Sequence, residues 1–175
     1  MKRFLPFLAA LLVIAPAAFA QNGGEGKSPA QFCKNELATL GAANFKSLYA
    51  PNGPAASAFG KCVSKHASAD AANRTNAAKA CRAEMEMPEA EFRATHDGKS
   101  FAEFYGKNRN ARNAFGMCVS SKAQAANAKQ EATLMKAAKT CKAERAANRT
   151  AFTARYGGKA ASAFGKCVSS KKKRQ

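Results

Sequence analysis

The sequence lacks several residue types on which large enzyme folds depend. It has no tryptophan and, beyond position 20, no isoleucine, three valines, four leucines and nine phenylalanines. Alanine, at 42 of 175 residues, makes up more than half of the 46% apolar content. So few β-branched and large apolar side chains cannot build a buried parallel sheet or a deep apolar pocket, which excludes Rossmann and barrel architectures. Because alanine is the best helix former, we expect an all-α fold.

Charge is nearly absent from the first 20 residues, where only Lys2 and Arg3 are charged. An uncharged apolar run follows them and ends in Ala18-Phe19-Ala20, the small-x-small pattern that signal peptidase recognises, directly before Gln21. This pattern predicts a signal peptide over residues 1–20, a flexible leader over 21–29, and a secreted or envelope-associated mature chain without a transmembrane segment. The alternative is an uncleaved anchor, because the run of about 17 residues is at the low limit for crossing a bilayer.

The six cysteines occur in an internal repeat of three units. An opening block A-x-x-C-[KR]-x-E contains Cys33, Cys81 and Cys141, and a closing block A-F-G-x-C-V-S contains Cys62, Cys118 and Cys167. Each pair of blocks flanks an F-x-x-x-Y element. A threefold match at this many positions indicates a true repeat. We place repeat 1 at 30–69, repeat 2, with an inserted loop and a linking helix, at 70–131, and repeat 3, with a basic tail, at 132–175.

Each repeat is predicted to be a helical hairpin, with flexible termini outside the array. The opening helix runs toward the F-x-x-x-Y element, and Gly106 and Gly157 are expected to end it in a left-handed conformation. The closing helix of repeat 2 and the opening helix of repeat 3 have no break between them, which predicts one long helix. A similar helix is expected from Cys62 to Cys81, although Ser68, Asp70 and Asn73 are candidate caps for a new start.

This arrangement favours disulfides within each hairpin. A continuous helix rises about 1.5 Å per residue and would hold Cys118 and Cys141 about 34 Å apart, whereas bridged Cα atoms lie within about 7 Å. Pairing within the hairpins gives Cys33–Cys62, Cys81–Cys118 and Cys141–Cys167. Metal binding by the thiols is the weaker alternative, because there is no C-x-x-C element and the only histidines are His66 and His96.

Other repeated positions suggest structural roles. The glycines before the closing cysteines, Gly60, Gly116 and Gly165, are expected to allow close approach of the opening helix. The position four residues after the opening cysteine holds Leu37, Met85 and Arg145 and is expected to cover the core. The recurring glutamates, Glu36, Glu84 and Glu144, are interpreted as ion-pair or surface contacts across each hairpin. We identify no catalytic, cofactor-binding or metal-ligating residues and expect no enzyme activity.

The three blocks together resemble the repeat of a group of uncharacterised exported proteins from high-GC Gram-positive bacteria. The resemblance covers nearly all of residues 30–171, and A-F-G-K-C-V-S, found at 58–64 and 163–169, is a fairly specific element of it. The resemblance implies export and a repeat architecture, and it supplies no catalytic residues. The inserted loop of repeat 2 departs from the simple pattern.

Charge is the remaining functional clue. Residues 132–175 contain twelve basic residues and one acidic residue, whereas residues 21–69 contain five basic residues and two acidic residues. Concentrated positive charge attracts polyanions through counterion release. We therefore expect association with an anionic polymer or envelope surface through the basic residues of repeat 3: Lys136, Lys139, Lys142, Arg149, Lys166, Lys171, Lys172, Lys173 and Arg174. The alternative is a structural or envelope-stress protein without a discrete ligand, in which charge serves solubility.

Overall fold

The described part of the chain is entirely helical. The computed structural model describes residues 27–174 except 109 and 158, and these residues form eight α-helices and no strand. The expected all-α fold is confirmed. The predicted signal peptide and most of the predicted leader lie outside the described residues.

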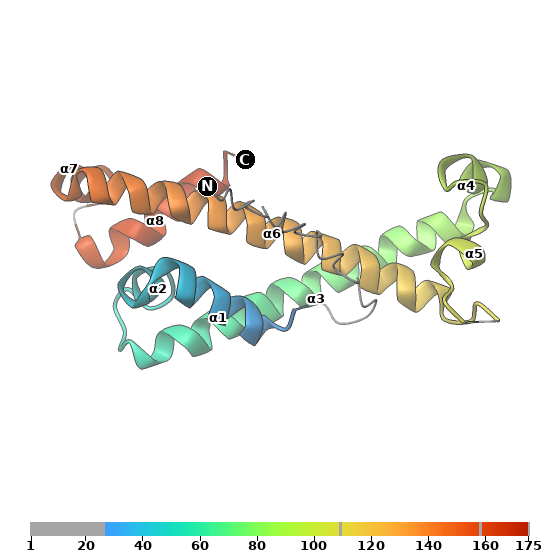
Figure 1. Ribbon diagram of the computed structural model, residues 1–175, viewed down its shortest axis with the longest axis horizontal. Coiled ribbons are helices and arrows are strands. Elements are labelled where there is room, and N and C mark those ends of the chain that lie inside the picture. Colours follow the sequence, from blue (N-terminus) through green and yellow to red (C-terminus); the bar gives the residue numbers. More distant parts are fainter. Residues whose placement is uncertain (1–26, 109, 158, 175) are drawn as a thin grey trace, which may run out of the picture.

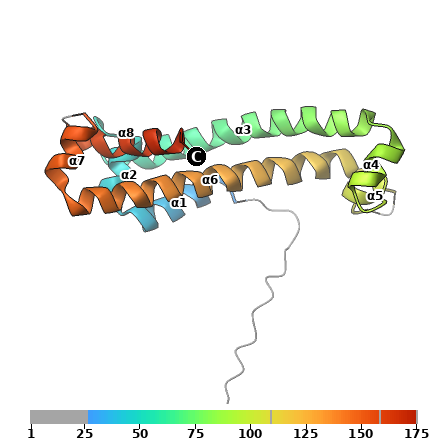
Figure 2. The same ribbon diagram turned by 90° about the horizontal axis from the view of Figure 1, so that it is seen from above.

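Two long helices form the axis of the molecule. Helices α3 (Ala56–Glu86) and α6 (Ala114–Ala147) lie antiparallel and side by side (Figures 1 and 2). Helix α3 contains Cys62 and Cys81, and α6 contains Cys118 and Cys141, so each helix joins two successive repeats.

Two of the candidate helix caps in α3 instead bind α6. The amide of Asn73 donates to Oδ1 of Asn127 over 2.6 Å, and the amide of Asn127 donates to Oδ1 of Asp70, also over 2.6 Å. Asn73 is buried. Buried polar pairs of this kind fix the register of two helices, because any slip leaves them without partners.

The short helices gather at the two ends of this axis. At one end, α1 (Pro29–Leu40), α2 (Ala42–Tyr49), α7 (Arg149–Arg155) and α8 (Ala160–Lys172) surround the start of α3 and the end of α6 (Figures 1 and 2). At the other end lie α4 (Glu89–Thr95) and α5 (Phe101–Tyr105). The chain thus brings repeats 1 and 3 together at one end, while repeat 2 closes the other; the insertion of repeat 2 forms α4.

The disulfides join the three pairs that the sequence predicted. Cys33 is bonded to Cys62, Cys81 to Cys118, and Cys141 to Cys167, with Cα–Cα distances of 5.9, 6.1 and 6.0 Å. All six cysteines are fully buried. Each bond links the two helices of one hairpin, in a chain that has few large apolar side chains to hold them together.

The apolar core is concentrated where repeats 1 and 3 meet. One cluster combines Leu40 of repeat 1 with repeat 3 residues that include Leu134, Phe152 and Phe164. A second cluster surrounds the Cys33–Cys62 disulfide and includes Phe45 and Tyr49. The opposite end depends on Phe92, which is buried and stacked against His96 with 3.8 Å between ring centroids.

Two expectations about helix ends need correction. The opening helices stop before the F-x-x-x-Y element, whose phenylalanine lies on a separate short helix, α2, α5 or α7. Gly157 has the expected left-handed conformation (φ +109°), but Gly106 does not (φ −72°). Glycine is required at 106 for another reason, because a Cβ there would lie 2.4 Å from the carbonyl oxygen of Ala102.

The expectations for two other repeated positions are also wrong. Apart from the neighbouring backbone of their own helices, no atom of the described residues lies within 4 Å of where a Cβ would be on Gly60 or Gly116. The corresponding point on Gly165 is 3.1 Å from the carbonyl oxygen of Ser47 in α2. That close approach is therefore between repeats 3 and 1. Leu37 and Met85 are exposed rather than core, and the related Arg145 donates from Nη1 to Asn44 Oδ1 over 2.8 Å.

Candidate anion-binding groove

A cationic groove lies where α2 of repeat 1 meets α8 of repeat 3. Its volume is about 600 Å³, and four of its lining residues are basic: Lys65, Lys166, Lys173 and Arg174. None of the described residues that line it is acidic, and serine hydroxyl groups lie among the cations at Ser47, Ser162, Ser169 and Ser170. Ammonium, guanidinium and hydroxyl groups are all donors to phosphate, sulfate and carboxylate oxygens. The groove therefore has the chemistry of an anion-binding site.

Helical spacing and one close contact create this groove. Ser162, Lys166 and Ser169 in α8 and Lys173 at its C-cap follow one another at intervals of four, three and four residues, so they share one face. The hydroxyl of Ser47 donates to the carbonyl oxygen of Ala161, and Gly165 lets the backbone of α2 approach. Lys65 reaches the groove from α3.

Several positive charges lie close together at the C-terminal end of α8. Burial lowers the pKa of Lys65, and repulsion from Lys172 lowers it further. The ammonium of Lys65 lies 5.5 Å from the centroid of the Tyr49 ring, over its face. A bound anion would relieve the repulsion between these cations, because it adds an opposite charge between them.

The predicted polyanion-binding residues are separated by the fold. Lys166, Lys173 and Arg174 line the groove, and Lys172 lies close enough to affect Lys65. Four other side chains of the predicted set are exposed along α6 and at the start of α7, outside the groove lining: Lys136, Lys139, Lys142 and Arg149. Lys65 was missed, because repeat 1 carries little net charge and only the docking of α2 on α8 reveals its position.

Lys171 has a different role from the one that its place in the basic tail predicted. Its ammonium pairs with Glu144 over 2.6 Å, and Tyr156 donates to the same carboxylate over 2.9 Å. Hydrogen bonding from Lys171, followed by that from Tyr156, lowers the pKa of Glu144. The charge of Lys171 is thus used within its own hairpin.

The same arrangement recurs in repeat 2, as the interpretation of the recurring glutamates anticipated. Lys122 pairs with Glu84 over 2.7 Å, and Tyr105 donates to Glu84 over 3.0 Å. Lys122 and Lys171 both lie four residues after the closing cysteine of their repeat. In repeats 2 and 3 the glutamate is therefore held by one tyrosine and one lysine.

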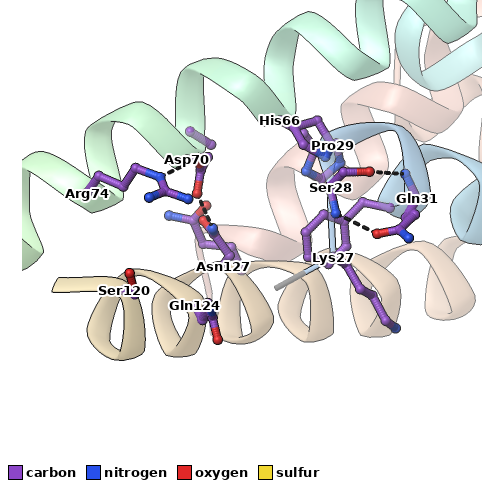
Figure 3. Close-up of a pocket in the computed structure, with 13 residues that line it drawn as sticks. Lys27, Ser28, Pro29, Gln31, His66, Asp70, Arg74, Ser120, Gln124 and Asn127 are labelled. Atoms are coloured by element: carbon purple, nitrogen blue, oxygen red, sulfur yellow. Dashed lines mark hydrogen bonds and ion pairs between the residues drawn. The ribbon is translucent and has the colours of Figure 1, made fainter. Parts of the chain in front are cut away.

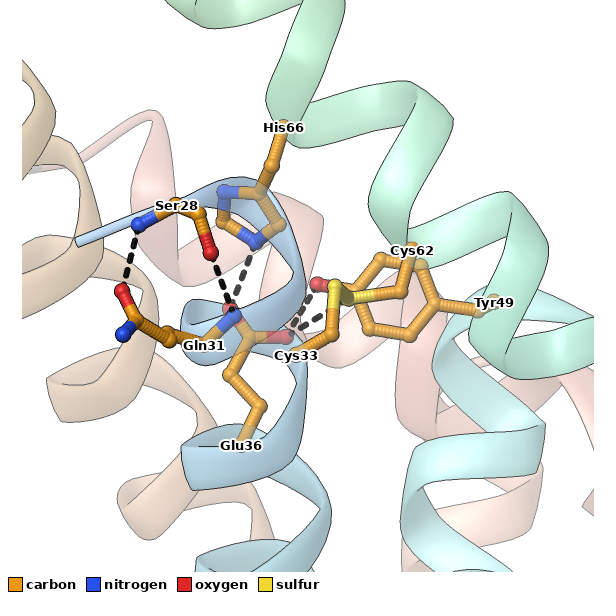
Figure 4. Close-up of a disulfide and its surroundings, with 7 residues drawn as sticks. All are labelled: Ser28, Gln31, Cys33, Glu36, Tyr49, Cys62 and His66. Atoms are coloured by element: carbon orange, nitrogen blue, oxygen red, sulfur yellow. Dashed lines mark hydrogen bonds and ion pairs between the residues drawn. A yellow bond between two sulfur atoms is a disulfide. The ribbon is translucent and has the colours of Figure 1, made fainter.

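Repeat 1 differs at the cation position, where it has His66 instead of lysine. The Nε2 atom of His66 lies 2.8 Å from Oε1 of Glu36, and Tyr49 donates to Oε2 of Glu36 (Figure 4). Glu36 is fully buried. Burial raises its pKa, but hydrogen bonds from His66 and Tyr49 outweigh that effect and lower it.

A second cleft, of about 700 Å³, lies between the start of α1 and the middle of α3 and α6 (Figure 3). Lys27, Asp70, Arg74 and Asn127 are among its lining residues, so its walls carry both signs of charge. His66 also lines it. This mixed lining gives no preference for anions, in contrast to the groove beside α8.

A scan against protein-family models and searches of curated proteins and of solved structures find no match to this chain. Among the described residues, none of the helices is both long enough and apolar enough to span a membrane.

Proposed function

We propose that this protein is an exported, non-enzymatic helical repeat protein that binds an anionic polymer or anionic envelope surface through the groove between α2 and α8. The observation that carries the proposal is the lining of that groove by Lys65, Lys166, Lys173 and Arg174, with no acidic side chain among the described lining residues. Export is supported by the signal-peptide pattern that ends at Ala20 and by three disulfides, which persist in oxidising compartments.

The fold extends the proposal beyond repeat 3 alone. The groove needs α2 and Lys65 from repeat 1 as well as α8 from repeat 3. The exposed cations on α6 and α7 would add longer-range attraction, because electrostatic steering acts over about a Debye length. Affinity should therefore depend on the intact molecule.

The test is a comparison of two charge-matched variants of the full mature chain. The groove variant carries Lys65→Gln, Lys166→Gln, Lys173→Gln and Arg174→Gln. The control variant loses four exposed charges outside the groove: Lys79→Gln, Arg82→Gln, Lys99→Gln and Lys129→Gln. The probe is a DNA duplex, with heparin as a second polyanion and dextran as the neutral comparison. The binding constant is measured against salt concentration.

We expect wild-type binding to both polyanions and none to dextran. The magnitude of the slope of log binding constant against log salt on the duplex should decrease by up to about 3.6 in the groove variant, since each of four lost phosphate contacts contributes about 0.9. The control should keep most of the affinity and slope. Equal losses in the two variants, or no wild-type binding at about 50 mM salt, would instead favour the alternative that charge serves solubility in a protein without a discrete ligand.

A further inference from the structure

The Glu36 environment of repeat 1 contains a second carboxylate that the other repeats do not have at their tyrosine–glutamate pair. Glu131 of α6 approaches Glu36, and one ligand atom each of Glu36, His66 and Glu131 lies within 4.8 Å of the other two. The three residues come from α1, α3 and α6. Glu131 belongs to none of the repeated blocks, so the repeat pattern does not account for it.

The second carboxylate lies in an unfavourable environment. The Oε2 atom of Glu131 is buried, and no donor among the described residues reaches it. Two neighbouring carboxylates in a buried place repel each other and lose hydration. Burial and the neighbouring Glu36 raise the pKa of Glu131 to about 8, so a proton on Glu131 relieves this repulsion near neutral pH, and a bound metal ion would displace that proton.

Comparison among the repeats shows what has changed. Repeats 2 and 3 use one lysine to balance one glutamate. Repeat 1 replaces this lysine by histidine and adds a glutamate, so an ammonium is exchanged for an imidazole and a carboxylate. This exchange removes a fixed positive charge and supplies a neutral nitrogen and a carboxylate oxygen, which are metal ligands.

We propose that Glu36, His66 and Glu131 form a binding site for a divalent transition-metal ion, with zinc as the test case. Two carboxylates and a neutral imidazole would make the occupied site electrically neutral. Ligation by mixed nitrogen and oxygen donors suits zinc, and the imidazole disfavours magnesium and calcium. The bound ion would link α1, α3 and α6.

The surroundings fit this role. The ring of His66 stacks on the buried Phe32 with 5.5 Å between centroids, which orients the imidazole, and Tyr49 donates to the other oxygen of Glu36. Zinc lies about 2.0–2.2 Å from nitrogen and oxygen ligands, which sets tetrahedral ligands about 3.3 Å apart. The 2.8 Å between His66 Nε2 and Glu36 Oε1 needs to widen by only about 0.5 Å. The cleft lined by His66 gives an ion a path to the site.

The Cys33–Cys62 disulfide lies beside the proposed site, so the site is tested in the oxidised protein. Cys33 and Cys62 also lie near His66, but both sulfur atoms are in the disulfide. The experiment therefore uses the untagged mature chain without reductant, with free thiols titrated to confirm that all three bonds are intact. Zinc binding is measured by isothermal titration calorimetry and by the shift in melting temperature, with magnesium as the comparison ion.

The informative variant is His66→Lys, which restores the residue type of the other repeats. It should fold with unchanged helicity, because lysine pairs with the equivalent glutamates Glu84 and Glu144. Glu131→Gln is the second variant, and His96→Gln, at the only other histidine, is the matched control.

We expect one zinc ion per chain and a zinc-dependent rise in the melting temperature of the wild type and of His96→Gln. His66→Lys and Glu131→Gln should each weaken binding by about 100-fold or more, since losing even the groups that support a ligand costs 10–100-fold. X-ray absorption should show nitrogen and oxygen ligands without sulfur. The proposal is overturned by absence of zinc binding to the wild type, by equal binding in His66→Lys, or by binding that requires reductant.

Discussion

At the scale of single residues, each disulfide lies beside a glutamate that a tyrosine and a lysine or histidine hold in place. In a chain with so few large apolar side chains, these polar groups contribute to the fixed geometry of each hairpin. The repeated position of the glutamate made a contact across the hairpin foreseeable. Its partner four residues after the closing cysteine could have been found in the same way, because His66, Lys122 and Lys171 occupy equivalent places.

We expect Glu144→Gln to remove a pH-dependent part of the stability. The pKa of Glu144 is lowered in the folded state, chiefly by Lys171. Its contribution is therefore complete above the unfolded value of about 4.3 and is lost as pH falls through the lower folded value. Near neutral pH it should be about 1 kcal/mol or less, because both side chains are partly exposed.

Thermal unfolding of Glu144→Gln and the wild type over a pH series measures this contribution. The difference between them should be largest near neutral pH and disappear in acid. Glu86→Gln, at an exposed glutamate on α3, serves as the control and should follow the wild type throughout. A difference between Glu144→Gln and the wild type that persists unchanged in acid would contradict the assigned ion pair.

At the scale of helices, three equivalent glycines have different surroundings and should respond differently to alanine. Gly60→Ala and Gly116→Ala place a methyl group in open space and should stabilise the fold by about 0.5–1 kcal/mol, since glycine costs that much in a helix. Gly165→Ala places it 3.1 Å from the backbone oxygen of Ser47. Gly165→Ala should therefore not gain this stability, and it should weaken the packing of α2 against α8.

Denaturant unfolding of the three variants gives the comparison, and polyanion affinity gives a second measure for Gly165→Ala. We expect lower affinity in that variant alone, because the groove depends on the contact between α2 and α8. A stabilised Gly165→Ala variant with unchanged affinity would show that α2 does not rest on this glycine.

The different surroundings of these three glycines show which parts of the fold could be predicted from the sequence. Helical hairpins, long joining helices and the disulfide pairs follow from local periodicity and cysteine spacing, and all are present. The docking of Gly165 on Ser47 joins residues more than 100 positions apart, and no local pattern encodes it. Lys65 in the groove and Glu131 beside Glu36 were missed for the same reason, because only the return of α6 and α8 to repeat 1 places them.

At the scale of the whole molecule, the two ends are held together by different means. Both apolar clusters lie at the end shared by repeats 1 and 3. The far end has the aromatic contacts of Phe92 and the Cys81–Cys118 disulfide. The paired asparagines Asn73 and Asn127 lie between the two ends. The far end should therefore be able to open while the cationic groove remains folded.

We predict that Cys81→Ala combined with Cys118→Ala unfolds the far end locally. Loss of this link costs about 3–4 kcal/mol on the chain-entropy model, and few apolar contacts at that end can replace it. Hydrogen exchange should become fast in α4, α5 and the adjoining parts of α3 and α6. Helices α1, α2 and α8 should keep their protection, and the groove should keep its polyanion affinity.

The matched variant, Cys141→Ala with Cys167→Ala, removes two members of the main apolar cluster. Protection from exchange should therefore fall in α8, and polyanion affinity should fall as well. Uniform loss of protection in both variants would mean that the molecule unfolds as one cooperative unit, because the long helices then transmit the disruption from one end to the other.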